Sequence, residues 1–246
     1  MTTKVAVIGA AGRMGSTACD AVEGAADLEL VGRYDDGDDL GDLGGADVAI
    51  DFTVLAASEG NVRQCVERGV HVVVGTSGWT DAKAEELRSE VEAKGDVGVL
   101  IAPNFAIGAV LMMKFAEQAA RFYESVEVIE LHHPRKVDAP SGTATRTAEL
   151  IGAARQEAGV GPVPDATTKD PDGARGATVE GVPVHAVRLR GLVAHQEVLL
   201  GNEGEMLTIR HDSFDRVSFM PGVLAGVREV GKHPGVTVGL EHVLGL

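Results

Sequence analysis

Positive charge is scarce in this chain: its 246 residues include 22 lysines and arginines against 37 aspartates and glutamates. The formal net charge of -15 argues against nucleic acid as a partner, because proteins bind phosphate backbones mainly through lysine and arginine. A small anionic ligand therefore needs a local basic patch that runs against the charge of the whole chain.

Cysteine is also scarce, and the two that occur, Cys19 and Cys65, fall on apolar faces of expected helices. We interpret both as core residues. The absence of a disulfide framework is typical of a reducing compartment, so we expect a cytoplasmic protein. The adjacent His132 and His133 have no cysteine or further histidine at ligand spacing, and we therefore expect no metal site.

Long apolar runs are missing as well. The longest, Val97 to Met113, is interrupted by Pro103 and Gly108 and is shorter than the ~20 residues that a membrane span needs. A strand, a turn and a helix explain it better, so no membrane partner is expected. The first residues lead directly into an expected strand, which argues against a signal peptide.

The first part of the chain alternates apolar strands with helical patterns. Such alternation predicts an α/β fold with a doubly wound, Rossmann-like parallel sheet. At 44% hydrophobic residues, a chain of this length can bury the core of one or two domains. The expected strands are Val5–Ile8, Leu28–Val31, Val48–Phe52, His71–Val74 and Val97–Ala102, and the expected helices are Ser16–Val22, Ala56–Glu67 and Asp81–Ala93.

Beyond Ala106 the pattern changes to one long helix, Gly108–Tyr123, and then to strands. Those strands are Glu127–Leu131, His185–Leu189, Gln196–Leu200 and Met206–His211. The last ones alternate as in an antiparallel meander, which predicts a second, substrate-binding domain. Residues 159–183 predict a long exposed loop. The tail, Phe219–Val230, predicts a helix that can return to the first domain, although the sequence does not force this return.

A glycine-rich turn follows the first expected strand: Gly9-Ala10-Ala11-Gly12-Arg13-Met14-Gly15. It is typical of a dinucleotide-binding turn, in which Gly9 makes the tight turn, Gly12 lets the backbone approach a diphosphate and Gly15 packs the helix on the strand. The spacing GxxGxxG departs from the commoner GxGxxG, so a tight turn without ligand remains an alternative.

Asp35 strengthens the nucleotide interpretation, because it follows the second expected strand, where an acid can bind the adenosine ribose hydroxyls. An acid there disfavours the extra phosphate of NADPH, and the chain continues with Asp36 rather than an arginine, which favours NADH. Arg13 and Arg33 can each reach a 2'-phosphate, so use of NADPH stays open.

Two further turns are expected at the same edge of the sheet: Gly75-Thr76-Ser77-Gly78 and Ala102-Pro103-Asn104-Phe105. Ligands of doubly wound sheets bind beyond the carboxyl ends of the strands, so both turns are expected to border the nicotinamide. Ordinary strand-exit turns use the same residue types, and the shared edge is what favours a functional role.

The most informative segment runs from Glu130 to Ala144. It combines His132, His133 and Lys136 with an expected helix start at Ser141, whose following backbone N–H groups can bind a carboxylate or phosphate. On a regular strand the two histidines would face opposite sides, so the strand has to end or bulge there, and Pro134 favours an end. The segment predicts a site for a small polyanion.

These residues together resemble the family of 4-hydroxy-tetrahydrodipicolinate reductase, also called dihydrodipicolinate reductase, of lysine and diaminopimelate biosynthesis. The resemblance covers essentially the whole chain, and its most specific part is the segment from Glu130 to Ala144. It implies a dinucleotide-binding domain built from residues 1–106 and 216–246. It also implies a central mixed-sheet domain, residues 107–215, that binds substrate and mediates a homotetramer.

The family reduces a cyclic conjugated imine with two carboxylates, using hydride from NADH or NADPH. The resemblance implies that His132 is the general acid and that Lys136 stabilises developing negative charge and is a candidate proton donor. It also implies that His133, Gly142 and Thr143 hold the substrate carboxylates. Ala11, where many relatives carry a basic residue, and Arg13, where lysine is frequent, are departures that bear on cofactor preference.

Two other functions stay open at this point. One is a nucleotide-binding redox sensor that has kept the fold and lost turnover, which predicts NADH binding without reaction. The other is a dehydrogenase of another small amino acid or imine, such as an aspartate dehydrogenase. A screen of substrates separates these functions, because each additional carboxylate needs its own cationic or helix-start partner.

Overall fold

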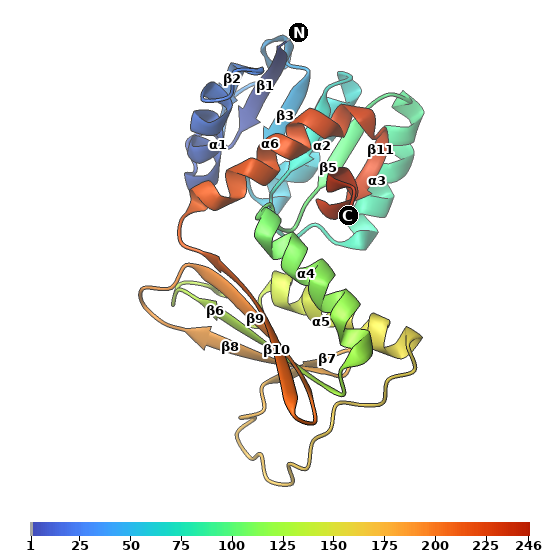
Figure 1. The fold of residues 1–246 in the computed structure, drawn as a ribbon. Coiled ribbons are helices and arrows are strands. Elements are labelled where there is room, and N and C mark those ends of the chain that lie inside the picture. Colours follow the sequence, from blue (N-terminus) through green and yellow to red (C-terminus); the bar gives the residue numbers. More distant parts are fainter. Residues whose placement is uncertain (1) are drawn as a thin grey trace. The chain divides into compact units, whose positions relative to one another are not determined.

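The computed structural model describes residues 2–246 (Figure 1). The chain divides into two compact units, one formed by Met1–Ile107 together with Arg216–Leu246 and the other by Gly108–Asp215. Each unit is built on its own sheet. Both ends of the chain therefore belong to the first unit, and the second unit is inserted between them.

The first unit holds a six-stranded sheet in the order β11-β5-β4-β3-β1-β2, and every pairing between these strands is parallel. Its strands are β1 (Thr3–Ile8), β2 (Leu28–Tyr34), β3 (Val48–Asp51), β4 (His71–Val74), β5 (Gly98–Ile101) and β11 (Gly235–Val238). All residues of β3 and β5 are buried. Such continuous apolar runs are typical of strands covered on both faces, which confirms the Rossmann-like sheet.

Helices cover both faces of this sheet: α1 packs beside α6, and α2 packs beside α3 (Figure 1). Their bounds are α1 (Arg13–Glu23), α2 (Leu55–Glu67), α3 (Asp81–Lys94), α6 (Met220–Glu229) and α7 (Glu241–Leu244), with short 3-10 turns η1 (Leu43–Gly45), η3 (Arg216–Phe219) and η4 (Val230–Lys232). Both cysteines are free and buried, as expected for core residues. Burial raises the pKa of Cys65 to about 12.

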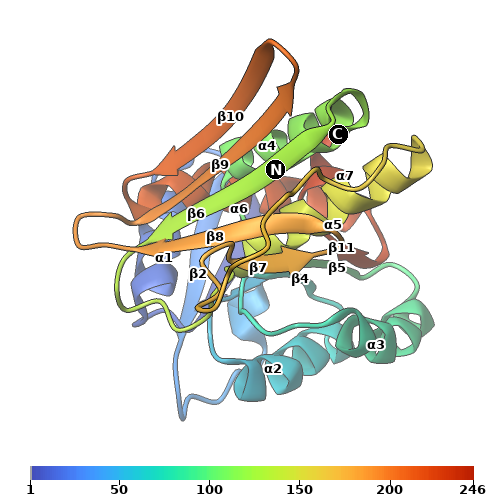
Figure 2. The ribbon, with the colours of Figure 1, turned by 90° about the horizontal axis from the view of Figure 1, so that it is seen from below.

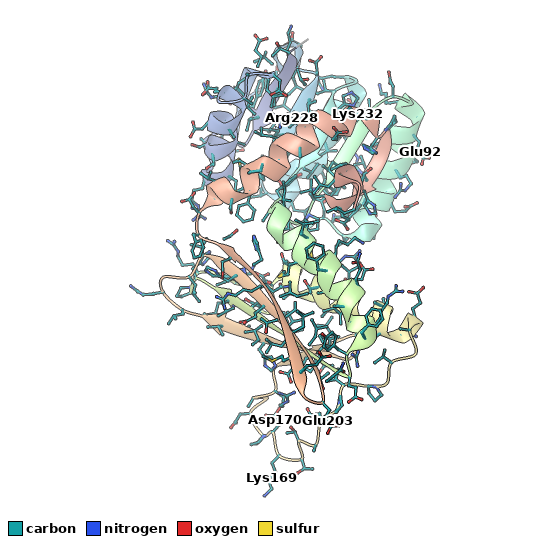
Figure 3. All side chains as sticks on the ribbon, viewed as in Figure 1. Glu92, Lys169, Asp170, Glu203, Arg228 and Lys232 are labelled. Atoms are coloured by element: carbon teal, nitrogen blue, oxygen red, sulfur yellow. The ribbon has the colours of Figure 1, made fainter. Side chains whose placement is uncertain are left out.

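The C-terminal tail returns to the first unit and completes its sheet. Helix α6 lies so close to the turn after β5 that a Cβ on Gly222 would stand 2.0 Å from the carbonyl oxygen of Phe105. Arg228, which lies on α6 (Figure 3), donates hydrogen bonds of 2.8 and 2.9 Å to Asp27. Strand β11 then pairs in parallel with β5 at the sheet edge. The expected helix is confirmed, whereas the strand was not predicted.

The second unit holds a mixed sheet of five strands in the order β10-β9-β6-β8-β7 (Figure 2). Its strands are β6 (Ser125–His132), β7 (Ala177–Val179), β8 (Val182–Arg188), β9 (Ala194–Asn202) and β10 (Glu205–Ser213), and its helices are α4 (Ile107–Ala119), η2 (Ala120–Phe122) and α5 (Gly142–Glu157). Central strand β6 pairs antiparallel with β9 and parallel with β8. The mixed sheet is thereby confirmed.

The expected meander is correct only for the hairpin of β9 and β10. Strand β8 lies beside β6 rather than beside β9, because the chain leaves β6 through α5, the kind of crossover that a parallel neighbour requires. The loop before β7 carries Lys169 and Asp170, and Glu203 lies at the hairpin turn between β9 and β10 (Figure 3).

Alternation along β6 separates two faces of the second sheet. Val126 and Val128 are buried in a cluster with Ala148 and Ile151 of α5, whereas Ile129 is only partly buried on the opposite face. Each such apolar side chain stabilises the fold by roughly 1.5–3 kcal/mol when fully buried. No helix among the described residues has the length and apolar character that crossing a membrane demands.

Candidate active site

The glycine turn after β1 has a backbone that only glycine fits at two positions. Gly9 has a φ of +83°, and a Cβ there would stand 2.4 Å from the carbonyl oxygen of Phe52. A Cβ on Gly15 would stand 2.0 Å from the carbonyl oxygen of Gly9. These distances are far below van der Waals contact, so the two glycines set how closely α1 approaches the turn.

The start of α1 is open to an anion. Gly12 is its N-cap residue and has no side chain to cap the helix, while its own N–H donates to the carbonyl oxygen of Gly9 at 3.0 Å. The first-turn N–H groups of Arg13 and Met14 have no helical acceptor by geometry. The turn therefore fits the diphosphate of a dinucleotide, as the sequence predicts.

Asp35 follows β2 directly and reaches back to the glycine turn. Its Oδ2 accepts a hydrogen bond of 2.6 Å from the N–H of Ala11, and its Oδ1 accepts one of 2.9 Å from the N–H of Asp36. The bonds from Asp36 and Ala11 lower the pKa of Asp35. The carboxylate is thus charged at neutral pH and lies beside the turn that would hold the diphosphate.

The two arginines that could reach a 2'-phosphate differ in their partners. Arg33 donates to Glu23, near the end of α1, at 2.8 Å. Arg13 is the first residue of α1 and is exposed, and among the described residues it has no ion-pair partner. Arg13 is therefore the arginine whose guanidinium can meet a phosphate without breaking an ion pair.

A completely buried carboxylate, Asp51, ends β3. Its Oδ1 accepts hydrogen bonds from the hydroxyls of Thr53 at 2.8 Å and Thr76 at 2.5 Å, and its Oδ2 accepts one from the amide of Asn61 at 3.0 Å. The hydroxyl of Thr76 in turn accepts a bond of 2.9 Å from the N–H of Thr53. Asp51 thus joins the exits of β3 and β4, a role that sequence reasoning missed.

The turns after β4 and β5 meet at the ring of Phe52. A Cβ on Gly75 would stand 2.1 Å from that ring, and the ring of Phe105 packs edge-on against it with a centroid distance of 6.1 Å. The side chain of Asn104 accepts a hydrogen bond of 2.8 Å from the N–H of Ala106. The two turns thus follow adjacent strands of one sheet. Of their expected residues, Ser77 and Pro103 are exposed and Ala102 is buried.

In the second unit, strand β6 ends at His132, which resolves the orientation of the two histidines. Glu130, two residues earlier, is completely buried and lies on the same face. Its Oε2 is 2.5 Å from Nδ1 of His132, and its two oxygens accept bonds of 2.7 Å each from Arg188. Its Oε1 also accepts a bond of 3.0 Å from the N–H of Ser141. Neither Glu130 nor Arg188 was assigned a role from the sequence.

The charges around His132 act on its pKa in opposite directions. Burial lowers the pKa of His132 from 6.5, the carboxylate of Glu130 raises it, and Lys136 and Arg188 lower it, with a net decrease. Burial by itself raises the pKa of Glu130, but the hydrogen bonds and charges of Arg188 and His132 together lower it overall. Glu130 is thus charged at neutral pH.

Lys136 and His133 lie in the loop after β6. The ammonium of Lys136 pairs with Asp138 at 2.8 Å, and its backbone N–H donates to the carbonyl oxygen of His133 at 3.2 Å. Burial raises the pKa of Asp138, but the hydrogen bond and charge of Lys136 together with backbone hydrogen bonds, among them one from Gly142, lower that pKa overall. Nδ1 of His133 is buried and, among the described residues, has no hydrogen-bond partner. It is therefore an unsatisfied polar atom inside the predicted substrate site.

Helix α5 begins as predicted. Ser141 is its N-cap residue, and its Oγ accepts a hydrogen bond of 3.2 Å from the N–H of Ala144. Gly142 is exposed and Thr143 is half-buried in the first turn. The helix start is joined to His132 through the shared carboxylate of Glu130. The described residues contain no group of three or more histidine, cysteine or acidic side chains that could hold a metal ion.

Two family models match the chain, one described as "Dihydrodipicolinate reductase, N-terminus" over residues 3–105 and one as "Dihydrodipicolinate reductase, C-terminus" over residues 108–244. The chain belongs to the dihydrodipicolinate reductase family. The C-terminal family model continues through α6 and β11, although these elements fold with the first unit.

Relatives in this family match along their whole length. A 4-hydroxy-tetrahydrodipicolinate reductase of Cutibacterium acnes is 63% identical over 99% of each chain, and one of Nocardia farcinica is 62% identical over 100% of each chain. A solved dihydrodipicolinate reductase from Paenisporosarcina sp. TG-14, bound to dipicolinate, is 38% identical with a TM-score of 0.85 and covers 98% of this chain and 99% of that chain.

Proposed function

We propose that this chain reduces 4-hydroxy-tetrahydrodipicolinate to tetrahydrodipicolinate in lysine and diaminopimelate biosynthesis. The family identifies an NAD(P)H-dependent oxidoreductase with dihydrodipicolinate reductase activity. The observation that carries the finer proposal is the cluster at the end of β6, where His132, a buried carboxylate and a helix start meet. A substrate with two carboxylates that also receives a proton needs anion-binding groups and a positioned proton donor, and this cluster provides both.

His132 is proposed as the general acid. A carboxylate only accepts hydrogen bonds, so the contact with Glu130 places a hydrogen on Nδ1 and leaves Nε2 as the atom that can hand a proton to substrate. Lys136 is proposed to stabilise negative charge that develops on the substrate, after leaving its pairing with Asp138. The net lowering of the pKa of His132 makes its protonated form a stronger acid.

The substrate carboxylates are proposed to bind at His133 and at the first turn of α5. The buried Nδ1 of His133 lacks a partner among the described residues, and a ligand oxygen would satisfy it. The N–H groups of Gly142 and Thr143 lie at the capped start of a sixteen-residue helix, where an anion is favoured. The Paenisporosarcina relative is bound to dipicolinate, a small dicarboxylate, which supports a ligand of this class.

The nicotinamide cofactor is proposed to bind at the glycine turn, Asp35, and the turns after β4 and β5. When bound, it supplies the hydride. Asp35 favours NADH because its charge would lie near a 2'-phosphate, whereas exposed Arg13 leaves NADPH usable. Gly9 and Gly15 hold the turn close to α1, and the uncapped start of that helix would bind the diphosphate.

A homotetramer assembled through the second unit is also proposed. The face of its sheet opposite α5 leaves Ile129, Leu131 and Leu199 only partly buried, and Val187 is 36% exposed. A sheet face of this kind is commonly covered by another chain. Light scattering of the purified protein tests the proposal, and a monomer at micromolar concentration would contradict it.

A cytoplasmic location is proposed as well. The two buried free thiols support it.

The test of function is oxidation of NADH and NADPH by the purified protein, with substrate generated in place from pyruvate and aspartate semialdehyde by the preceding synthase. Substrate-dependent oxidation is expected, with a higher rate for NADH at low nucleotide concentration. Binding of NADH without oxidation, while substrate formation is confirmed, would favour the redox sensor instead. Oxidation that depends on another amino acid or imine would favour another dehydrogenase.

A further inference from the structure

We propose that Glu130 is a positioning residue that acts through His132: its buried carboxylate fixes the tautomer and orientation of the imidazole and, through Ser141, the placement of the anion-binding helix start. The inference rests on the proposed role of His132 as general acid. It adds a residue that was not among those predicted from the sequence.

The hydrogen bonds of Glu130 use both of its oxygens. Oε2 contacts Nδ1 of His132 at 2.5 Å and one guanidinium nitrogen of Arg188 at 2.7 Å. Oε1 accepts from the other guanidinium nitrogen at 2.7 Å and from the N–H of Ser141 at 3.0 Å. The side chain is 0% exposed, so these protein groups rather than bulk water satisfy both oxygens and restrict the carboxylate to this arrangement.

Strand geometry explains why one carboxylate reaches all of these groups. Residues 130 and 132 of β6 share a face of the sheet, which places the imidazole beside the carboxylate. Parallel pairing sets His132 opposite Arg188 on β8, which brings the guanidinium to the same point. The N–H of Ser141 comes from the start of α5, where negative charge is favourable.

Arg188 extends this arrangement to the loop that carries Lys136. Its guanidinium donates a hydrogen bond of 2.6 Å to the carbonyl oxygen of Asp138, the residue that pairs with Lys136. Glu130 therefore holds the imidazole directly, the helix start through Ser141 and the lysine loop through Arg188. A carboxylate that served only stability would not need a histidine of the proton-transfer site among its partners.

The charge on Glu130 also controls which form of His132 donates the proton. The charged groups that face His132 are Glu130, Lys136 and Arg188, and only Glu130 favours the protonated imidazole. Arg188 keeps the carboxylate ionised, so the proton stays on the imidazole rather than moving to Glu130. After donation from Nε2 the neutral ring keeps its Nδ1 hydrogen and its bond to Glu130.

The test is Glu130→Gln, with Glu127→Gln as matched control. Glu127 lies on the same strand and also pairs with an arginine and a histidine, Arg175 at 2.6 Å and His185 at 2.7 Å. Glu130→Gln is expected to lower kcat/KM by about 10–100-fold, the scale of a misplaced general acid, with unchanged affinity for NADH. Glu127→Gln is expected to stay within about twofold of the parent.

The pH profile distinguishes positioning from stability. Because Glu130 raises the pKa of His132, its neutralisation is expected to move the alkaline decline of kcat/KM to lower pH. A smaller kcat/KM with the parent pH profile would overturn the proposal, as would parent activity. Glu130→Asp keeps the charge but retracts it by one methylene, and it is the variant to use where Glu130→Gln does not fold. Turnover of Glu130→Asp at the parent rate would also overturn the proposal.

Two measurements separate failure of this inference from failure of the proposed function. Nitrogen-15 spectra of the substrate-free protein report the His132 tautomer, and loss of the Nδ1-protonated form in Glu130→Gln is expected. The double variant Glu130→Gln with His132→Ala is expected to lose less activity than the product of the two single losses, because the action of Glu130 on the imidazole is already gone in His132→Ala. Losses that multiply fully in the double variant would overturn action through His132, while an active His132→Ala enzyme would overturn the general-acid assignment itself.

Discussion

Asp51 and Glu130 are both completely buried carboxylates, one in each unit, and their partners are of different kinds. Asp51 is held by two threonine hydroxyls and an asparagine amide, all neutral. Glu130 is held by the guanidinium of Arg188 and by the imidazole of His132. Burying a carboxyl group is costly unless its oxygens are hydrogen-bonded, so both side chains depend on these partners.

The difference shows what each unit requires of its carboxylate. Neutral donors let Asp51 fix the exits of β3 and β4 without placing a cation beside the proposed nicotinamide position. Charged partners tie Glu130 to the ionisation of His132, where a proton is proposed to move. One arrangement fixes geometry and the other fixes geometry and charge, so we expect changes at the two carboxylates to have separable effects.

The largest expected effect concerns the proton-transfer side of this comparison. His132→Ala and Lys136→Ala are each expected to lower turnover by about 10²–10⁴-fold while NADH affinity changes little, because both residues lie in the second unit. Steady-state rates together with calorimetric titration of NADH measure both quantities. Glu127→Gln serves again as control, and a parallel loss of NADH affinity in both variants would contradict separate functions.

The next largest effect concerns the neutral network in the first unit. Asp51→Ala leaves the donors of Thr53, Thr76 and Asn61 without their acceptor, so the free energy of unfolding is expected to fall by about 1–3 kcal/mol. Nucleotide affinity is expected to fall as well, while the pH profile of turnover keeps its midpoint. Urea unfolding and NADH titration test this.

The matched control for Asp51 is Asp27→Asn, which removes an ion pair with Arg228 in the same unit but at an exposed position. A smaller loss of stability is expected there, because exposed ion pairs contribute little. Equal stability of Asp51→Ala and Asp27→Asn would contradict a structural role for the Asp51 network. A shift of the pH profile in Asp51→Ala, of the kind expected for Glu130→Gln, would contradict the distinction between Asp51 and Glu130.

Acid is expected to weaken the second unit by a smaller amount. The pKa of His132 is lowered from 6.5, mainly by burial. As the pH falls below 6.5, the unfolded chain therefore binds a proton at this histidine more readily than the folded chain, and the free energy of unfolding decreases. The pKa of Glu130 is lowered from 4.5, so its contribution is lost at still lower pH. Unfolding free energies between pH 7.5 and 4 in the parent and in His132→Ala are the measurement. An unchanged slope between about pH 6.5 and 5 in the variant would contradict the assignment to His132.

The choice of cofactor is expected to depend on Asp35. Asp35→Ala should weaken NADH by about tenfold, the scale of one charged hydrogen bond, and NADPH by less, because the repulsion of the 2'-phosphate is removed at the same time. The Asp35 side chain also accepts a hydrogen bond from the N–H of Ala11, so its loss is expected to disturb the glycine turn for both nucleotides. Dissociation constants for both nucleotides test this, and equal weakening would remove Asp35 as a discriminator.

The smallest effect is expected at Arg33. Its ion pair with Glu23 occupies the guanidinium, so Arg33→Ala should leave the ratio of NADH to NADPH affinity within about twofold of the parent. Arg13→Ala, at an exposed guanidinium, should weaken NADPH more than NADH. A change in the ratio for Arg33→Ala alone would reverse the assignment of the two arginines.

Sequence patterns predicted most elements of the fold because these depend on neighbouring residues. His71–Val74 is a strand as predicted, and α5 begins after Ser141 as its capping residue indicates. Strand β11 was missed because Gly235–Val238 is a four-residue run without clear alternation, and only its pairing with β5 makes it a strand. The parallel neighbour of β6 was missed for the same reason, since pairing depends on long-range contacts.

The sequence by itself determined the glycine turn, the strand that ends at His132 and the capped helix start, because each is a property of adjacent residues and their backbone conformations. Only the tertiary structure decided which side chains complete the site. Arg188 reaches Glu130 across 58 positions and Thr76 reaches Asp51 across 25. Such contacts depend on the order and register of strands, which no local pattern encodes. The contact of Arg188 with Glu130 fixes the surroundings of the proposed proton donor, and the contact of Thr76 with Asp51 fixes the turn after β4 that is proposed to border the nicotinamide.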